Sequence, residues 1–150
     1  MTKITDAFLG EHGVFYAQFD QLEAALPTEN RIEVLRGSAS LLAAGLEPHA
    51  RLEDDLLFAA MENQAGVGLG PASTMRAEHE EIEGALRRAV VATDPARARE
   101  TLLEAIHLAR AHFLKEEQVA FPMAEEVLGA EDLRRLGGEW ARARGVVLAS

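Results

Sequence analysis

The chain of 150 residues contains no cysteine, which excludes disulfides, iron–sulfur clusters, thiolate zinc sites and thiol catalysis. Aromatic residues make up only 5% of the sequence, and no segment alternates strictly between apolar and polar residues, so a β-sheet is not expected. No run reaches the roughly 18 apolar residues that a membrane-spanning helix needs. The first ten residues also lack the pattern of a signal peptide. We therefore expect a cytoplasmic protein with no membrane partner.

Basic residues are also scarce, with 15 Lys and Arg against 25 Asp and Glu and a formal net charge of -10. Such a surface repels phosphate backbones, so nucleic acid is not an expected partner. Part of the negative charge could be internal, where carboxylates bind and neutralise a cation. The hydrophobic content of 48% in a chain of this length predicts one folded domain over residues 1–150.

Proline and glycine divide the chain into segments that are rich in helix-forming residues. Breaks are expected at Pro27, in a flexible loop containing Gly66, Gly68, Gly70 and Pro71, at Asp94-Pro95 and at Gly129. The predicted helices cover residues 3–26, 30–64, 72–92 and 95–128, with a shorter one at about 131–144. This pattern predicts an all-α, up-down-up-down four-helix bundle over about 3–128 with a short extra C-terminal helix. The pair Gly45 and Pro48 predicts a kink or a helix start inside the second segment.

Each long segment carries an inward stripe of mainly apolar residues at alternating steps of three and four. The first stripe is Phe8, His12, Phe15, Phe19, Leu22 and Leu26, and the third is Met75, His79, Ile82, Leu86 and Ala89. The second is Leu35, Ala39, Leu42, Leu46, His49, Glu53, Leu56 and Ala60. The fourth is Leu102, Ala105, Ala109, His112, Glu116, Val119 and Met123.

One histidine therefore stands at a core position of every stripe, and two of these histidines are followed by a glutamate four residues later, as in His49/Glu53 and His112/Glu116. Residues four apart lie about 40° apart around a helix, so both side chains can point at one spot. Glu83 has the same spacing from its histidine but lies at the edge of its stripe.

A buried carboxylate costs several kcal/mol or more unless it is paired, and no Lys or Arg lies on the stripes near these residues. A multivalent cation resolves the conflict. Histidine and carboxylate ligands without thiolates suit iron, with manganese as the alternative. The ligands are too many for one tetrahedral zinc ion and fit two octahedral ions that share bridging carboxylates. The predicted ligands are His12, His49, Glu53, His79, Glu83, His112 and Glu116.

Other polar residues receive simpler interpretations. His107 is about 200° from the stripe position Ala105 and is predicted to face solvent. Glu117 is about 100° from the stripe that holds Glu116, which favours a solvated carboxylate or one that contacts a ligand from behind. Tyr16 follows His12 by four residues, where packing is favoured over a hydrogen bond to the site. Two acidic clusters are interpreted as solvated faces: Glu78-Glu80-Glu81 and Glu125-Glu126.

Together these motifs resemble the hemerythrin-like, or HHE cation-binding, family over roughly residues 5–128. The matching pieces are Glu11-His12, Glu47-Pro48-His49-Ala50-Arg51-Leu52-Glu53, Glu78-His79-Glu80-Glu81-Ile82, His112-Phe113-Leu114-Lys115-Glu116-Glu117, and Phe121-Pro122. The resemblance implies a left-turning four-helix bundle around a di-iron centre joined by carboxylates or by an oxygen atom. It would place His12 and His49 on one iron, His79 and His112 on the other, and Glu53 and Glu116 as bridges.

The sequence departs from the oxygen-carrying members of that family at two positions. Those carriers have a second histidine on the third helix where this chain has Glu83. They also place the fourth-helix carboxylate five residues after its histidine, which would select Glu117, whereas the stripe selects Glu116. A more carboxylate-rich site stabilises the ferric state, which argues against simple oxygen carriage.

The resemblance implies a di-iron protein that reacts with or senses dioxygen, peroxide or nitric oxide. A reversible oxygen carrier, an iron-buffering protein and a di-iron oxidase of an organic substrate remain as alternatives, so enzymatic activity is left open. The expected partner is a small diatomic or peroxide ligand. The stretch 131–150, with Trp140, is expected to cap the bundle or to form a dimer contact, which leaves open a monomer or a homodimer.

Overall fold

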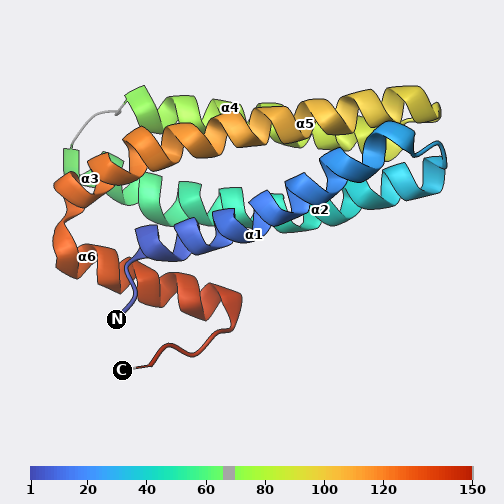
Figure 1. Cartoon of the computed structure of the whole chain (residues 1–150). Helices are drawn as coiled ribbons and strands as arrows, with labels where there is room; N and C mark the ends of the chain where they lie inside the picture. Colours follow the sequence, from blue (N-terminus) through green and yellow to red (C-terminus); the bar gives the residue numbers. More distant parts are fainter. Residues whose placement is uncertain (66–69, 150) are drawn as a thin grey trace.

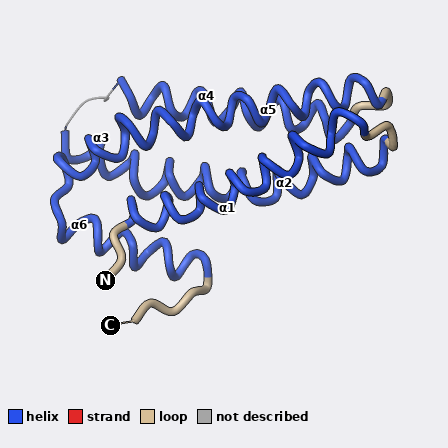
Figure 2. Tube along the Cα trace, in the orientation of Figure 1, coloured by secondary structure: helices blue, strands red, loops and turns tan. Residues whose placement is uncertain are grey.

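The computed structural model describes residues 1–65 and 70–149, and those residues form helices and short connections with no strand among them (Figure 2). The long helices are α1 (Ile4–Ala25), α2 (Ile32–Leu52), α4 (Gly70–Val91), α5 (Pro95–Lys115) and α6 (Phe121–Arg144). The shorter elements are a 3-10 turn η1 (Leu26–Thr28), two π-helical segments η2 (Glu53–Phe58) and η3 (Glu116–Ala120), and α3 (Ala59–Ala65). The predicted all-α class is confirmed. Most of the predicted loop at 66–71 lies outside the described residues, while Gly70 and Pro71 begin α4.

The helices form four long rods, and the direction of the chain reverses from one rod to the next (Figure 1). The rods are α1, the continuous run α2–η2–α3, α4, and the run α5–η3 into α6. Asp94 caps α5, because its carboxylate accepts a hydrogen bond from the backbone N–H of Arg97 at 2.9 Å. These four rods fit the predicted bundle.

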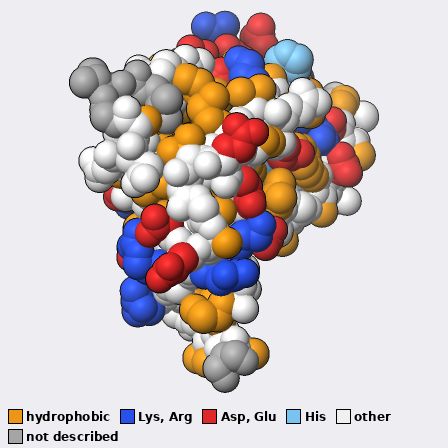
Figure 3. All heavy atoms as spheres, turned by 90° about the vertical axis from the view of Figure 1, so that its left-hand side faces the viewer, with side chains coloured by type: hydrophobic (Ala, Val, Ile, Leu, Met, Phe, Trp, Pro, Cys, Tyr) orange, Lys and Arg blue, Asp and Glu red, His pale blue; other side chains and the backbone are white. Residues whose placement is uncertain are grey.

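The last helix, α6, folds back along α1 at the end of the bundle where the N-terminus lies (Figure 1). A separate helix was predicted at 131–144. In the structure these residues lie in α6, which spans Phe121–Arg144 and is kinked at the predicted break, Gly129, whose φ of 74° and ψ of 165° are not helical. Glycine allows this left-handed turn because it has no Cβ. Hydrophobic, acidic and basic side chains are interspersed on this end of the molecule (Figure 3).

The buried apolar side chains form two clusters, one toward each end of the bundle. Phe15, Phe19, Leu35, Leu86 and Leu102 belong to the cluster around η1 and the α4–α5 connection. The other cluster lies beneath α6 and includes Phe8, Phe58, Met61, Phe121 and Leu133. Between them lies a layer of buried polar side chains, which the next section describes. No helix among the described residues is both long and apolar enough to cross a bilayer.

The π-helical segments η2 and η3 correct the predicted stripes. Each begins at one of the two stripe glutamates, Glu53 and Glu116. A π-helical turn accommodates one extra residue, so it rotates the following helix relative to a regular α-helix. The buried residues beyond each turn stand one position later than predicted: Leu57 and Met61 in place of Leu56 and Ala60, and Ala120 and Ala124 in place of Val119 and Met123.

The predicted helix start near Gly45 and Pro48 is wrong, because α2 continues through both residues. Pro48 removes one backbone donor without ending the helix. Gly45 has a packing role instead. A Cβ there would lie 2.9 Å from Cε1 of Phe15, so the missing side chain lets that ring approach α2 closely.

Candidate metal centre

Six of the seven predicted ligands meet in the polar layer at the middle of the bundle. His12 comes from α1, His49 from α2, His79 from α4 and His112 from α5, while Glu53 and Glu116 begin η2 and η3. All six are buried, with at most 5% of each residue exposed. Their ligand atoms form two groups, and the atoms within each group all lie within 4.8 Å of one another. One group is His12, His49, Glu53 and Glu116, and the other is Glu53, His79, His112 and Glu116.

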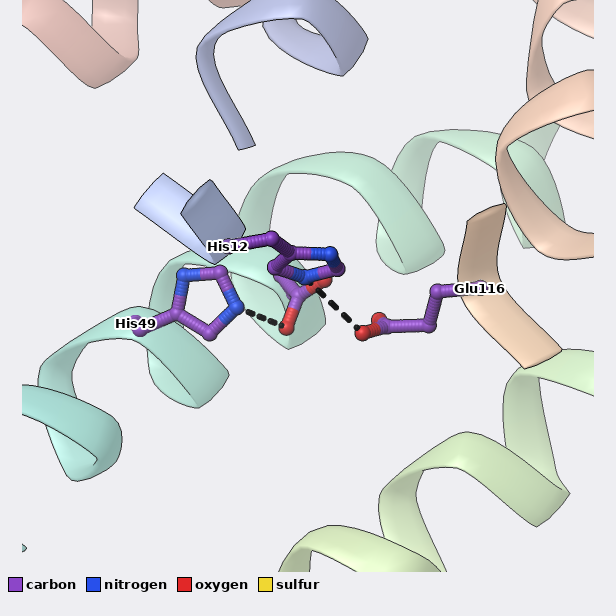
Figure 4. Close-up of side chains that lie close together, drawn as sticks. His12, His49 and Glu116 are labelled. Atoms are coloured by element: carbon purple, nitrogen blue, oxygen red, sulfur yellow. Dashed lines mark ion pairs between the residues drawn. The ribbon is translucent and has the colours of Figure 1, made fainter. Parts of the chain in front are cut away.

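The two glutamates belong to both groups, and each lies close to one histidine of the first group and one histidine of the second. Oε1 of Glu53 is 2.9 Å from Nε2 of His49 and 3.4 Å from Nε2 of His79. Oε1 of Glu116 is 3.3 Å from Nε2 of His12 and 3.2 Å from Nε2 of His112. Figure 4 shows His12, His49 and Glu116 pointing toward one another from three separate helical segments. This is the arrangement that two ions with shared carboxylate ligands require.

The facing atoms have no hydrogen-bond partner within the described part of the chain. They are Nε2 of His12, His49, His79 and His112, and both carboxylate oxygens of Glu53 and Glu116. An unpaired buried polar group costs about 1–3 kcal/mol, and more if it is charged. Eight such atoms converging on one place would be costly in a purely structural core. They fit a metal cation, because imidazole nitrogen and carboxylate oxygen are its ligand atoms.

The pKa values of these groups show the same electrostatic conflict. Burial raises the pKa of Glu116 well above its ordinary value, and the negative charge of Glu53 raises it further. Burial lowers the pKa of His49 and His79, but the carboxylates around them outweigh burial and raise both values to about 9. Burial also lowers the pKa of His112, to about 4, and the positive charge of His79 contributes. The metal-free site therefore retains protons where a bound cation would replace them.

A second layer of carboxylates holds the other nitrogen of each of the four buried histidines, and each carboxylate comes from the preceding helical rod around the bundle. The four pairs are His49 Nδ1 with Glu11 at 2.5 Å, His79 Nδ1 with Asp54 at 3.0 Å, His112 Nδ1 with Glu78 at 3.2 Å, and His12 Nδ1 with Glu117 at 2.9 Å. An ionised carboxylate only accepts, so Nδ1 carries the proton and donates it. In the neutral imidazole this leaves the lone pair of Nε2 facing the centre.

These four hydrogen bonds form a closed ring around the bundle. α1 supplies the carboxylate that holds the histidine of α2, and η2 supplies the one that holds the histidine of α4. In the same way, α4 supplies the carboxylate for the histidine of α5, and η3 supplies the one for the histidine of α1. Each outer carboxylate is adjacent in sequence to an inner ligand, as in Glu11-His12 and Glu116-Glu117. The ring therefore fixes the orientation of all four imidazoles by the packing of neighbouring helices.

Three of the outer carboxylates have further donors. Glu117 accepts a hydrogen bond from the hydroxyl of Tyr16 at 2.6 Å, and Glu78 accepts one from Nζ of Lys115 at 2.6 Å. Glu11 accepts from Nε1 of Trp140 at 2.9 Å and from Nε of Arg144 at 2.7 Å. Burial raises the pKa of Glu11, but the hydrogen bonds from His49 and Arg144 outweigh it and lower the value to about 2.

Aromatic rings surround the histidines and keep them away from solvent. The ring of His12 stacks on Phe113 at a centroid distance of 3.8 Å with an interplanar angle of 5°. His49 contacts the edges of Phe8 and Phe15, with centroids 5.5 and 5.3 Å away. A nonpolar surround lowers the local dielectric and strengthens every electrostatic interaction at the centre.

A small cavity of about 10 Å³ lies beside the centre, between α2, α4 and α5. Its lining residues are Leu46, His49, Ala50, His79, Ile82, Glu83, His112 and Phe113. The volume is close to the minimum that accommodates one water molecule. Glu83, the seventh predicted ligand, lies at this cavity and not in either ligand group, and its side chain is 29% exposed. Its Oε2 is 3.8 Å from Nη1 of Arg87.

The remaining predictions have mixed outcomes. His107 is exposed, as predicted. Tyr16 was interpreted as a packing residue, but it also donates to Glu117, which itself contacts His12 from behind. The solvated interpretation of Glu78 is wrong, because it binds His112 and Lys115. Glu125 remains partly solvated, with 36% of its side chain exposed, and it accepts from Lys3 at 2.7 Å and from Thr5 at 2.5 Å.

A protein-family model described as the hemerythrin HHE cation binding domain matches residues 3–124 of the chain. The match covers the four buried histidines and both shared glutamates. It ends near the start of α6, so most of that helix lies beyond it. Neither the curated proteins nor the solved structures give a match.

Proposed function

Because the chain belongs to the hemerythrin HHE cation-binding family, we propose that it holds two iron ions and uses them to react with or sense dioxygen, peroxide or nitric oxide. The observation that carries the proposal is the pair of ligand groups sharing Glu53 and Glu116. His12 and His49 would hold one ion, and His79 and His112 the other. When bound, iron supplies a change of oxidation state and a position for a small ligand.

The protein residues prepare this chemistry in three ways. The outer carboxylates orient the imidazoles, so that Nε2 faces the ions. The aromatic rings, Phe113 above all, limit the access of water. Glu83 lines the cavity from α4, and we assign it either to an ion as an additional ligand or to a bound molecule as a proton carrier.

The size of the cavity favours a very small ligand. A volume of about 10 Å³ beside the histidines suits a molecule of about the size of water. An organic substrate would need a much larger space, on the order of hundreds of Å³. Dioxygen, nitric oxide and hydrogen peroxide would therefore need less expansion of this cavity than an organic molecule would.

Metal analysis of protein purified without a metal-affinity step tests the di-iron proposal. We expect two iron atoms per chain, a large loss in His112→Ala, and no loss in His107→Ala, the matched control on the exposed face of α5. Protein that acquires neither iron nor manganese under reducing conditions would overturn the proposal.

Stopped-flow absorbance of the reduced, iron-loaded protein tests the reactive function. We expect a spectral change on mixing with dioxygen, peroxide or nitric oxide. A stable oxygen spectrum that disappears reversibly under vacuum would identify a carrier instead. No change with any of the three molecules would refute the proposal for reactivity while leaving the metal site in place.

A further inference from the structure

The segment of α6 beyond the family match reaches the metal centre through Glu11. The match ends at residue 124, whereas Trp140 and Arg144 lie near the end of α6. Both side chains donate to Oε1 of Glu11, while Oε2 of the same carboxylate accepts from Nδ1 of His49. Two residues of the C-terminal segment are therefore one carboxylate away from a candidate metal ligand.

We propose that Trp140 and Arg144 are positioning residues for the half of the metal centre formed by His12 and His49, and that they act through Glu11. The inference rests on the proposed function, since it concerns the affinity of that half for an ion. It makes residues 131–144 a working part of the site.

The geometry at Glu11 supports this role. The carboxylate is largely buried, with 15% of its side chain exposed, so solvent alone cannot hold it in one orientation. The two donors engage one oxygen, and the other oxygen is left for His49. The guanidinium of Arg144 also pairs with the carboxylate, with Nε 2.7 Å from Oε1, which holds the side chain in place to accept from the imidazole.

The C-terminal segment is anchored well enough to act as a support. Leu133, Leu136 and Ala141 are buried, the first two in the apolar cluster beneath α6. Gly137 packs directly against the N-terminal residues, because a Cβ there would collide with the carbonyl oxygen of Thr2. This packing holds the segment in place, so Trp140 and Arg144 contact Glu11 from a fixed position.

The support is asymmetric between the two halves of the centre, which makes it testable. In the other half, Lys115 of α5 donates to Glu78, which holds His112, and Lys115 lies within the family match. Within residues 1–65 and 70–149, neither Trp140 nor Arg144 forms a hydrogen bond or ion pair with the His79 and His112 half. Removing either donor, Trp140 or Arg144, should lower the affinity for one ion and leave the affinity for the other unchanged.

Titration of metal-free full-length protein with cobalt(II), followed by visible absorption, measures both affinities. We expect Glu11→Gln to weaken one of the two binding steps by about 10- to 100-fold, the usual effect of altering a partner directly behind a metal ligand, and Arg144→Met and Trp140→Phe to weaken the same step by up to about 10-fold because they act through Glu11. Arg144→Lys, which restores the charge, should recover most of the loss. The exposed neighbour Arg142 provides the control, because Arg142→Met should leave both steps unchanged.

Imidazole NMR of the same variants without metal identifies the half that is affected. In Arg144→Met we expect the Nδ1 resonance of His49 to move, with His79 and His112 unchanged. Circular dichroism and thermal unfolding show whether each variant folds.

The outcomes separate the two proposals. Wild-type cobalt affinities together with a wild-type His49 resonance in both Arg144→Met and Trp140→Phe would overturn the positioning role. If both steps weaken equally, the residues support the fold as a whole and the inference is also wrong. If the wild-type protein binds no cobalt, the proposed di-iron function fails, and the His49 resonance still decides whether the segment positions that side chain.

Discussion

Replacing Glu116 with methionine is expected to stabilise the metal-free protein while removing its capacity to hold two ions. Glu116 is fully buried, and neither of its oxygens has a hydrogen-bond partner among the described residues. It also faces Glu53, whose charge, together with burial, raises the pKa of Glu116. A methionine of similar volume removes the two unpaired oxygens without leaving a large cavity.

The magnitude follows from these contacts. Leaving a buried polar group unsatisfied costs about 1–3 kcal/mol, and we expect Glu116→Met to stabilise the metal-free protein by about that amount because it removes the group. The adjacent residue gives a matched control with the opposite sign. Glu117 accepts from Tyr16 at 2.6 Å and from His12 at 2.9 Å, so Glu117→Met strands two donors and should cost about 1–3 kcal/mol.

Urea unfolding of chelator-treated protein measures both changes as shifts of the midpoint at constant slope. With iron(II) present anaerobically, the order should reverse, because only a protein that binds the ions gains from them. That gain is about 2.7 kcal/mol at a free metal concentration one hundred times the Kd. A metal-free Glu116→Met protein that is less stable than wild type by more than 1 kcal/mol would refute the reasoning, since it would mean that Glu116 is satisfied without an ion.

Three further results are expected. Metal binding at pH 7.5 should release protons, because His49 and His79, whose pKa values are raised to about 9, must lose a proton before they bind an ion. A weakly buffered titration with a pH indicator counts the released protons. A count that does not fall above pH 9 would contradict the assignment of these protons to the two histidines. In the metal-free protein the same two histidines contribute stability that is fully present below about pH 6.5 and lost as the pH rises through 9, which a series of urea midpoints will show. Gly45→Ala should cost about 1–3 kcal/mol because its Cβ would meet Phe15, whereas Gly37→Ala, with nothing within 4 Å, should stabilise α2 by about 0.5–1 kcal/mol; equal effects would refute the packing role of Gly45.

The sequence was sufficient to predict the helical bundle and the six buried residues that converge at its centre. The stripes before Glu53 and Glu116 follow regular helical geometry, and the buried residues agree with them. The prediction failed just after each glutamate, where the π-helical turns rotate the helix. Whether a turn of this kind forms depends on contacts between helices, so a helical wheel drawn on one segment does not contain it.

Three of the four outer carboxylates, Glu11, Asp54 and Glu78, were missed for a related reason. Glu11 and Glu78 each stand one residue before a stripe histidine, about 100° away around the helix. On a single helix, that direction is predicted to face solvent. In a bundle that direction points at the neighbouring helix, where His49 and His112 lie. The sequence did contain a usable signal, because each outer carboxylate is adjacent to an inner residue. The adjacent pairs are Glu11-His12, Glu53-Asp54, Glu78-His79 and Glu116-Glu117. The reach of Trp140 to Glu11 could not be predicted, because it depends on the turn of the backbone at Gly129.

The closed ring of carboxylate and histidine pairs has a mechanical consequence. Every rod both supplies a carboxylate to one neighbour and receives one from the other, so no rod can spin about its axis or slide without breaking two links. The spacing between opposing ligand atoms is then set by the protein before any ion arrives. Because such a frame resists expansion, we expect the centre to bind small transition-metal ions in preference to larger ions such as calcium.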